Sequence, residues 1–257
     1  MGRKLSWATL TAGAALSAAL AAGFESRDRA SAPPRRQPLA DPTLAATPEQ
    51  RQFLKYLVGC ALPESVELYA DIGGERFAFP GSLGLAPAWA ERGLAETEQR
   101  WVSACILART NLFGKTVPVS MRARVPAHPA LETDSKERQT YTLPEGGFFG
   151  NLFAERPVAY VCAGDRTPAQ AADPVLAERV CTAPSGRRTA NGDPITRCGF
   201  IAVGACGETS RYTVNGETYT EVIFAYLKPG HIDSREPVRL ETRARHSCMN
   251  GLFQCER

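Results

Sequence analysis

The sequence predicts an α+β protein: two N-terminal helices with a small hairpin, followed by a mostly antiparallel β region that disulfides stabilise. Three observations lead to this class. Apolar residues recur at helical spacing in two segments of the first half of the chain. Beyond residue 116 the apolar spacing changes to two, which is typical of strands. The chain also contains 8 cysteines, an even number.

The first helix is predicted to begin after Thr47. The segment Thr47-Pro48-Glu49-Gln50 combines a capping residue, a proline in the first turn and a glutamine that can reach back to the cap. Pro63 ends the helix, and Cys60 lies at the edge of its apolar face. That face consists of Phe53, Leu54, Leu57, Val58 and Ala61.

The second helix is predicted from about Ala95 to Phe113. Glu96 and Glu98 suit its positive N-terminal end, and Gly114 suits its C-terminal cap. One cysteine therefore lies on or beside the buried face of each helix. The apolar face of this second helix consists of Trp101, Val102, Cys105, Ile106, Ala108 and Leu112.

The remaining elements are predicted as strands that turns separate. Asp71-Ile72-Gly73-Gly74 is expected to join two short strands between the helices, and Asn215-Gly216 is the strongest turn signal in the chain. After the second helix, apolar residues alternate with Ser120, Arg122 and Arg124. The predicted strands are Val66–Ala70, Arg76–Phe79, Val158–Cys162, Gly199–Gly204, Tyr212–Val214, Thr218–Leu227 and Val238–Ala244.

The N-terminus has the pattern of a secretory signal peptide. Arg3 and Lys4 precede an uncharged stretch from Leu5 to Leu20, and small residues follow at the positions that a signal peptidase recognises. We expect a signal peptide over residues 1–21 with cleavage before Ala22; a second register lies two residues further on. The alternative is an uncut membrane anchor, but the stretch is alanine-rich and only just reaches the roughly 20 residues needed. No stable transmembrane anchor is therefore expected after cleavage.

The composition changes between residues 22 and 47. Pro33, Pro34, Pro38 and Pro42 stand among arginines and acidic residues, without an apolar period of either kind. Such a stretch buries too little surface to offset its ordering entropy, so we expect a disordered linker. Residues 48–257 are expected to form a globular disulfide-bonded domain, or two sub-lobes: a helical one over 48–116 and a β-rich one over 117–257.

The charge balance excludes a strongly basic or acidic protein. The chain has 30 basic and 27 acidic residues, a net charge of +3, and loss of Arg3 and Lys4 with the signal peptide leaves +1. This balance gives no indication of nucleic-acid binding. The sequence also lacks the glycine patterns of nucleotide-binding loops, so no cofactor is expected.

The cysteines are expected to form four disulfides in an oxidising compartment. A zinc site is the alternative, with possible ligands His246, Cys248, Cys255, Cys198 and Cys206. However, no C-x-x-C pair exists and the other spacings do not fit, so no metal is expected. The two helical faces predict the pair Cys60–Cys105. The sequence-local pairing of the rest is Cys162–Cys181, Cys198–Cys206 and Cys248–Cys255; the alternative joins Cys198 or Cys206 to the C-terminal pair.

Glu145 is the candidate catalytic residue, because it opens the unusual segment Glu145 to Phe153, which is rich in glycine and aromatic residues. A carboxyl group beside apolar rings has a raised pKa, as a general acid requires. A glycoside hydrolase would need a second carboxylate about 5–10 Å away, and the sequence does not identify one. The alternative is a tight loop whose three phenylalanines fill a core.

Three segments together resemble a group of exported, cysteine-rich proteins of large-genome Gram-negative soil bacteria. They are Leu54–Leu62, Arg100–Asn111 and Glu145–Phe153. The resemblance implies a periplasmic, surface or secreted location. It implies no activity and transfers no functional residue.

These observations favour an exported binding or surface-interaction module with an envelope or extracellular ligand. The main alternative is a hydrolase that acts on envelope or extracellular polymers, with Glu145 as its acid. A third is a purely structural surface protein. An open cleft at Glu145 with a nearby carboxylate would favour the hydrolase, whereas a buried, ion-paired Glu145 would favour the binding module.

Overall fold

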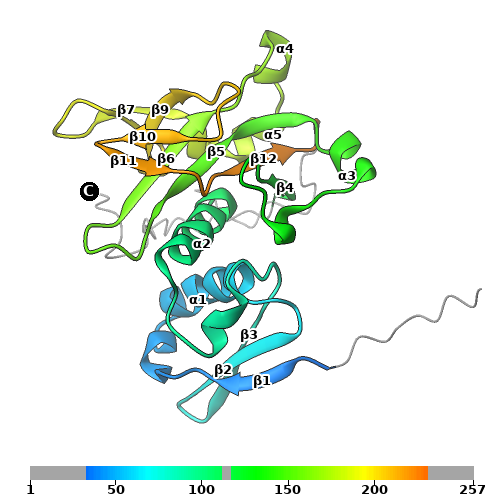
Figure 1. Cartoon of the computed structure of the whole chain (residues 1–257), viewed down its shortest axis with the longest axis vertical. Helices are drawn as coiled ribbons and strands as arrows, with labels where there is room; N and C mark the ends of the chain where they lie inside the picture. Colours follow the sequence, from blue (N-terminus) through cyan, green and yellow to red (C-terminus); the bar gives the residue numbers. More distant parts are fainter. Residues whose placement is uncertain (1–32, 112–116, 231–257) are drawn as a thin grey trace, which may run out of the picture. The chain divides into compact units, whose positions relative to one another are not determined.

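The computed structural model describes residues 33–111 and 117–230, which form an α+β fold (Figure 1). Disulfides link parts of this fold. The predicted signal peptide, the strand predicted at Val238–Ala244 and the pair Cys248–Cys255 lie outside these residues. Within them, no helix is long and apolar enough to cross a membrane.

A three-stranded sheet opens the described chain. Strand β1 (Arg35–Pro38) lies parallel to β2 (Val66–Ile72), which pairs antiparallel with β3 (Glu75–Pro80). Gly73 and Gly74 join β2 to β3 with φ of 61° and 84°, a left-handed turn that glycine adopts without a Cβ clash.

The prediction of a disordered linker is wrong for residues 33–47. This part contains β1 and a 3₁₀ helix at Pro42–Ala45. Backbone hydrogen bonds to β2 order it, and the side chains of Leu39 and Ala45 are buried in the main core. Two buried residues at irregular spacing give no apolar period, which is why the sequence did not show this element.

Helix α1 (Pro48–Ala61) begins where the sequence predicts. The Thr47 hydroxyl accepts a hydrogen bond from the Gln50 backbone N–H (3.2 Å), and the Gln50 side chain accepts one from the Thr47 N–H (2.9 Å). This reciprocal pair satisfies two N–H groups that lack a helical partner.

Helix α2 (Glu96–Arg109) ends earlier than predicted. Thr110 leaves the helix with extended backbone, and its hydroxyl donates to the Ile106 carbonyl at 2.9 Å. Gly114, the predicted cap, lies outside the described residues. Every residue from Trp101 to Ala108 is buried, because α2 packs against α1 and also against the large sheet.

The large sheet has seven strands in the order β4-β12-β5-β6-β9-β8-β7 (Figure 1). All neighbours are antiparallel except β6 and β9, which are parallel. The strands are β4 (Val119–Arg122), β5 (Leu143–Asn151), β6 (Val158–Ala163), β7 (Pro184–Arg188), β8 (Pro194–Thr196), β9 (Ile201–Ala205) and β12 (Ile223–Leu227).

The predicted strand Thr218–Leu227 is divided in two. Its first part, β11 (Glu217–Tyr219), forms a separate hairpin with β10 (Tyr212–Val214) through the Asn215-Gly216 turn, in which both residues have positive φ. Its second part is β12 in the large sheet. The described chain also has three short α-helices, α3 (Ser135–Thr140), α4 (Pro168–Ala171) and α5 (Val175–Glu178), and further 3₁₀ turns at Pro87–Ala90, Pro129–Leu131 and Val180–Thr182.

The glycine-rich segment that begins at Glu145, for which a tight loop was the alternative, lies in β5, an inner strand of the large sheet. Phe148 packs into the main core beside α2, whereas Phe149 lies on the opposite face of the sheet. A Cβ on Gly147 would lie 2.7 Å from Cys162 Sγ and 2.9 Å from the Phe224 ring. Glycine at this position therefore lets both groups approach the strand closely.

Two hydrophobic cores lie on the two faces of the large sheet. The main core is continuous across residue 116 and combines α1, α2, the three-stranded sheet and one face of the large sheet. The second core is a cluster of mainly aromatic side chains, to which the β10–β11 hairpin contributes Tyr212 and Tyr219. In it the ring of Phe149 stacks on Tyr212 with centroids 4.7 Å apart and on Tyr160 at 5.4 Å.

The disulfides confirm one predicted pair and correct two. Cys60–Cys105 joins α1 to α2 as predicted. The pairs Cys162–Cys181 and Cys198–Cys206 are wrong, and so is the alternative that joins Cys198 or Cys206 to the C-terminal pair: the structure has Cys162–Cys206 and Cys181–Cys198. The reason is the parallel pairing of β6 with β9, which places the two strand ends side by side.

Candidate functional site

Glu145 lies at an irregularity of β5 and points away from solvent. Gly146 pairs with Ala225 of β12 and Pro144 pairs with Tyr226, so Glu145 is an extra residue without a partner across the ladder. Such a bulge redirects a side chain. The Glu145 side chain is 0 % exposed.

Arg179 holds the Glu145 carboxylate in this buried position. Its Nη2 lies 2.8 Å from Glu145 Oε2 and its Nε lies 3.1 Å from the same oxygen, and Arg179 is itself 2 % exposed. The guanidinium also donates to the carbonyls of Ala108 (2.6 Å) and Thr110 (3.1 Å). The pair therefore joins β5 to the C-terminal end of α2, where carbonyls lack helical partners.

This environment does not suit a general acid that must reach a substrate. Burial raises the pKa of Glu145, and the attraction of Arg179 opposes that rise. A catalytic acid has to contact the group that it protonates, yet no surface of Glu145 is open to solvent. The geometry supports a structural role for this ion pair.

A different group of side chains lies on the opposite face of the sheet. Strands β4 and β12 are antiparallel with Arg122 opposite Phe224, so both residues are on one face. The guanidinium carbon of Arg122 lies 4.1 Å from the Tyr226 ring centre, and that of Arg124 lies 4.0 Å from the Phe224 ring centre. We call Arg122, Arg124 and Arg138 the arginine face.

Backbone and hydroxyl acceptors fix the positions of the two stacked arginines. Arg122 donates through Nη2 to the Tyr141 carbonyl (2.7 Å) and through Nε to the Ser120 hydroxyl (2.9 Å). Arg124 donates through Nη1 to the carbonyls of Gly207 (2.6 Å) and Thr209 (2.9 Å). A guanidinium has five N–H donors, so each arginine keeps donors for a further partner.

The arginine face lines a pocket of about 240 Å³. Ala123, Leu131, Thr133 and the two aromatic rings complete its walls, and no carboxylate is among the lining residues. Burial lowers the pKa of Arg122; nearby Arg138 adds to this effect, and Tyr226 and Glu137 oppose it. The guanidinium nevertheless stays charged at neutral pH. Within the described part of the chain, none of the three arginines forms an ion pair.

A second pocket of about 250 Å³ adjoins the first. The two pockets share Arg124, Phe224 and Tyr226 as a common wall. Unlike the first, this pocket is lined by two carboxylates, Asp165 and Glu208. The sheet face thus carries positive charge on one side of the shared wall and negative charge on the other.

Comparison with known proteins finds no match. This holds for protein-family models, for curated protein sequences and for solved structures.

The structure does not support the alternative of a zinc site built on Cys198 and Cys206. Both sulfurs are in disulfides, so neither is a thiolate that could bind metal. His246, Cys248 and Cys255, the other ligands of that alternative, lie outside the described residues. In residues 33–111 and 117–230, no three His, Cys, Asp or Glu side chains are grouped as metal ligands.

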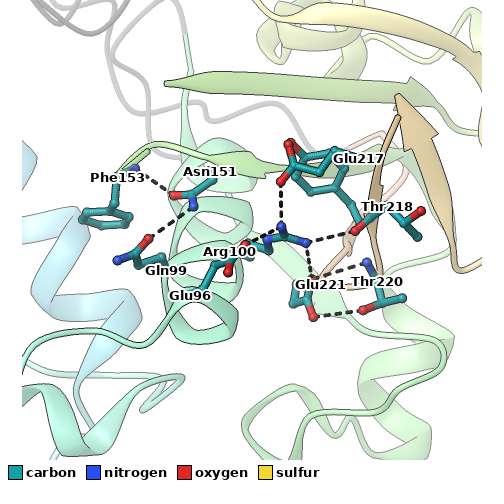
Figure 2. A network of polar contacts seen from close by, with 10 residues as sticks. Glu96, Gln99, Arg100, Asn151, Phe153, Glu217, Thr218, Thr220 and Glu221 are labelled. Atoms are coloured by element: carbon teal, nitrogen blue, oxygen red, sulfur yellow. Dashed lines mark hydrogen bonds and ion pairs between the residues drawn. The ribbon is translucent and has the colours of Figure 1, made fainter. Parts of the chain in front are cut away.

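Arg100 differs from the arginine face because carboxylates surround it (Figure 2). Its Nη2 lies 2.6 Å from both Glu96 and Glu217, and its Nη1 lies 2.9 Å from the Thr218 carbonyl and 3.9 Å from Glu221. These contacts join α2 to the segment that runs through β11. Carboxylates of the same chain already pair with the charge of Arg100, so this network has a structural role.

Proposed function

We propose that the protein is an exported binding protein and that its arginine face binds an anionic ligand. The observation that carries the proposal is a single pocket with three guanidinium groups and no carboxylate among its lining residues. Hydrogen bonds between arginine and a carboxylate or phosphate are shorter and stronger than neutral ones. An anion in this pocket would supply the counter-charge that Arg122, Arg124 and Arg138 lack within the described chain.

The positions of the arginines also favour binding. Stacking on Phe224 and Tyr226 and hydrogen bonds to fixed acceptors restrict Arg122 and Arg124 before any ligand arrives. Less side-chain entropy is then lost when the complex forms, so each contact contributes more to affinity. Arg138 is exposed, and among the described residues its side chain donates only from Nε to Thr133 Oγ1 (2.9 Å), so most of its donors remain for a ligand.

A binding role is preferred to a hydrolase because of the surroundings of Glu145. Its carboxylate is enclosed and ion-paired to Arg179, which suits a structural residue better than an acid catalyst. The pocket at the arginine face is lined by three guanidinium groups and no carboxylate, which suits an anion rather than acid catalysis.

Export is supported by the disulfides and by the N-terminal pattern. Three intramolecular disulfides are typical of extracellular or periplasmic proteins. The test is N-terminal sequencing and non-reducing mass spectrometry of protein from the native host. A chain that begins at Ala22 with every cysteine oxidised is expected; an intact leader with reduced cysteines in the cytosol would contradict export.

Anion binding can be tested with inorganic phosphate and hexanoate as probes. We expect both to shift the backbone amide resonances around Arg122, Arg124 and Arg138 in NMR titrations at low ionic strength. Arg138→Gln should weaken binding about tenfold, because a charge-assisted hydrogen bond is worth roughly 1.5 kcal/mol or more. Added salt should weaken it further by screening.

The matched control is Arg156→Gln, which removes an exposed arginine away from both pockets. It should leave the affinity unchanged. Arg124→Gln should also weaken binding, with circular dichroism to confirm that the variant is folded. The proposal is wrong if neither probe binds at millimolar concentration, or if Arg138→Gln and Arg156→Gln behave alike.

A further inference from the structure

We infer that the ligand is dipolar, with an anionic group at the arginine face and an ammonium group in the adjoining pocket beside Asp165 and Glu208. This inference rests on the proposed function and adds the second half of the ligand. It follows from three features of the second pocket: the lining residues that it shares with the first, its carboxylates without an ion pair in the described chain, and its size.

The two pockets adjoin and share part of their lining. Arg124, Phe224 and Tyr226 line both, so a ligand that extends over these side chains from the arginine face would contact both pockets. The remaining walls of the second pocket come from the start of β5, the segments after β6 and β9, and β12; they include Thr142, Pro144 and Gln170. Glu145 lies in sequence between Pro144 and Gly146, which both line this pocket, but its own side chain is buried on the opposite side of the sheet.

The carboxylates of the second pocket are not neutralised by the arginines beside them. Arg124 donates to the carbonyls of Gly207 and Thr209, on either side of Glu208, and not to the Glu208 carboxylate. Arg166 follows Asp165 but donates to the carbonyls of Pro144 and Glu145.

Asp165 and Glu208 are both exposed, and neither forms an ion pair within the described residues. Each can therefore accept from a ligand. An ammonium group is the complementary partner, since it carries three donors and a full positive charge.

This arrangement disfavours a polyanion. A second anionic group that extended from the arginine face would meet Asp165 and Glu208 and be repelled by like charges. A ligand with opposite charges at its two ends satisfies both pockets. With about 240 and 250 Å³ available, the ligand is a small molecule or a chain end rather than a bulky polymer segment.

The shared chemistry is an anion and an ammonium joined by a short spacer. Amino acids and short peptides supply a carboxylate, and amino sugars or amino alcohols with a phosphate group supply a phosphate. A probe panel can distinguish these sources. It consists of ω-amino acids with three to eight carbons, hexanoate, hexylamine, 6-aminohexyl phosphate and hexyl phosphate.

Isothermal titration calorimetry of the full mature chain tests the inference. The best ω-amino acid is expected to bind about tenfold more tightly than hexanoate, or 6-aminohexyl phosphate about tenfold more tightly than hexyl phosphate. Whichever ratio is larger identifies the source. In the double variant Asp165→Asn/Glu208→Gln the dipolar probes should lose this advantage while hexanoate and hexyl phosphate bind at least as well as before.

The control is Glu155→Gln, which removes an exposed carboxylate outside both pockets and should leave the ratio unchanged. If the simple anions bind as tightly as every dipolar probe, the inference is overturned and the proposed anion site stands. If no anion binds at all, the proposed function fails and the inference fails with it.

Discussion

Replacement of Arg179 by methionine is expected to destabilise the protein by about 6 kcal/mol at neutral pH. The substitution keeps the apolar length of the side chain but removes the guanidinium. It leaves the Glu145 carboxylate, 0 % exposed, without its cation. It also leaves the carbonyls of Ala108 and Thr110 without the donors that lie 2.6 and 3.1 Å away.

The magnitude follows from these two losses. Breaking a buried ion pair by removal of one partner costs about 3–5 kcal/mol. Each carbonyl that loses its partner adds about 1 kcal/mol. Glu145→Gln should cost less, about 2–3 kcal/mol, because the amide keeps the shape and one acceptor oxygen and the carbonyls keep Arg179.

The cost of Arg179→Met should grow as the pH rises. Burial raises the folded-state pKa of Glu145 above its ordinary 4.5, and removal of Arg179 takes away the attraction that opposes this rise. The folded variant therefore holds the proton more tightly than the unfolded chain does. The contribution of Glu145 to the stability of the variant is fully present below about pH 4.5 and is lost as the pH rises through the folded-state pKa of Glu145.

Urea denaturation of wild type and variant between about pH 5 and pH 8 measures this difference. In the double variant Glu145→Leu/Arg179→Met, which buries no charge, the deficit should fall to about 2 kcal/mol, the share of the two carbonyls. A deficit for Arg179→Met below about 1 kcal/mol, or one independent of pH, would refute the structural role assigned to this pair.

Three further substitutions test the packing. Gly147→Ala should lower the free energy of unfolding by about 2 kcal/mol, because the new methyl group would lie 2.7 Å from Cys162 Sγ. Arg100→Met should lower it by about 3 kcal/mol, because Glu221, only 7 % exposed, loses its cation. Paired replacement of Cys162 and Cys206 by alanine should lower it by about 4 kcal/mol, the entropic value for a separation of 44 residues.

Thermal unfolding measures all three, since 1 kcal/mol corresponds to about 2–4 °C in Tm for a domain of this size. Gly93→Ala is the control for the first, because no atom lies within 4 Å of the added Cβ, and it should leave Tm nearly unchanged. A stable Gly147→Ala, an Arg100→Met with wild-type Tm, or a peptide map that links Cys162 to any residue other than Cys206 would each contradict the structure.

The elements that local signals specify could be predicted from the sequence. The capping box at Thr47 fixes the start of α1, and Asn215-Gly216 fixes the β10–β11 turn. The pair Cys60–Cys105 could also be inferred, because each cysteine lies beside the apolar face of a helix and two such faces pack together.

Non-local pairing could not be predicted in the same way. Cys162 and Cys206 meet because β6 and β9 run parallel, and the crossover that connects them leaves no mark in the spacing of the cysteines. Sequence proximity therefore suggested the wrong partners for both residues.

The candidate site shows the same division. The alternation that points Arg122 and Arg124 to one face is visible in the sequence, but their aromatic partners are on β12, about a hundred residues later. Only the register of β4 against β12 brings them together. The bulge that turns Glu145 inward likewise depends on pairing with β12.

The burial of α2 on all sides has a consequence for how the protein opens. A helix that packs on one side only can unfold locally while the rest of the molecule stays folded. In α2, the residues from Trp101 to Ala108 are buried between α1 and the large sheet. Water can reach these amides only if both contacts separate at once. Their hydrogen exchange should therefore be governed by global unfolding, which makes α2 the slowest-exchanging part of the chain and a direct reporter of whole-domain cooperativity.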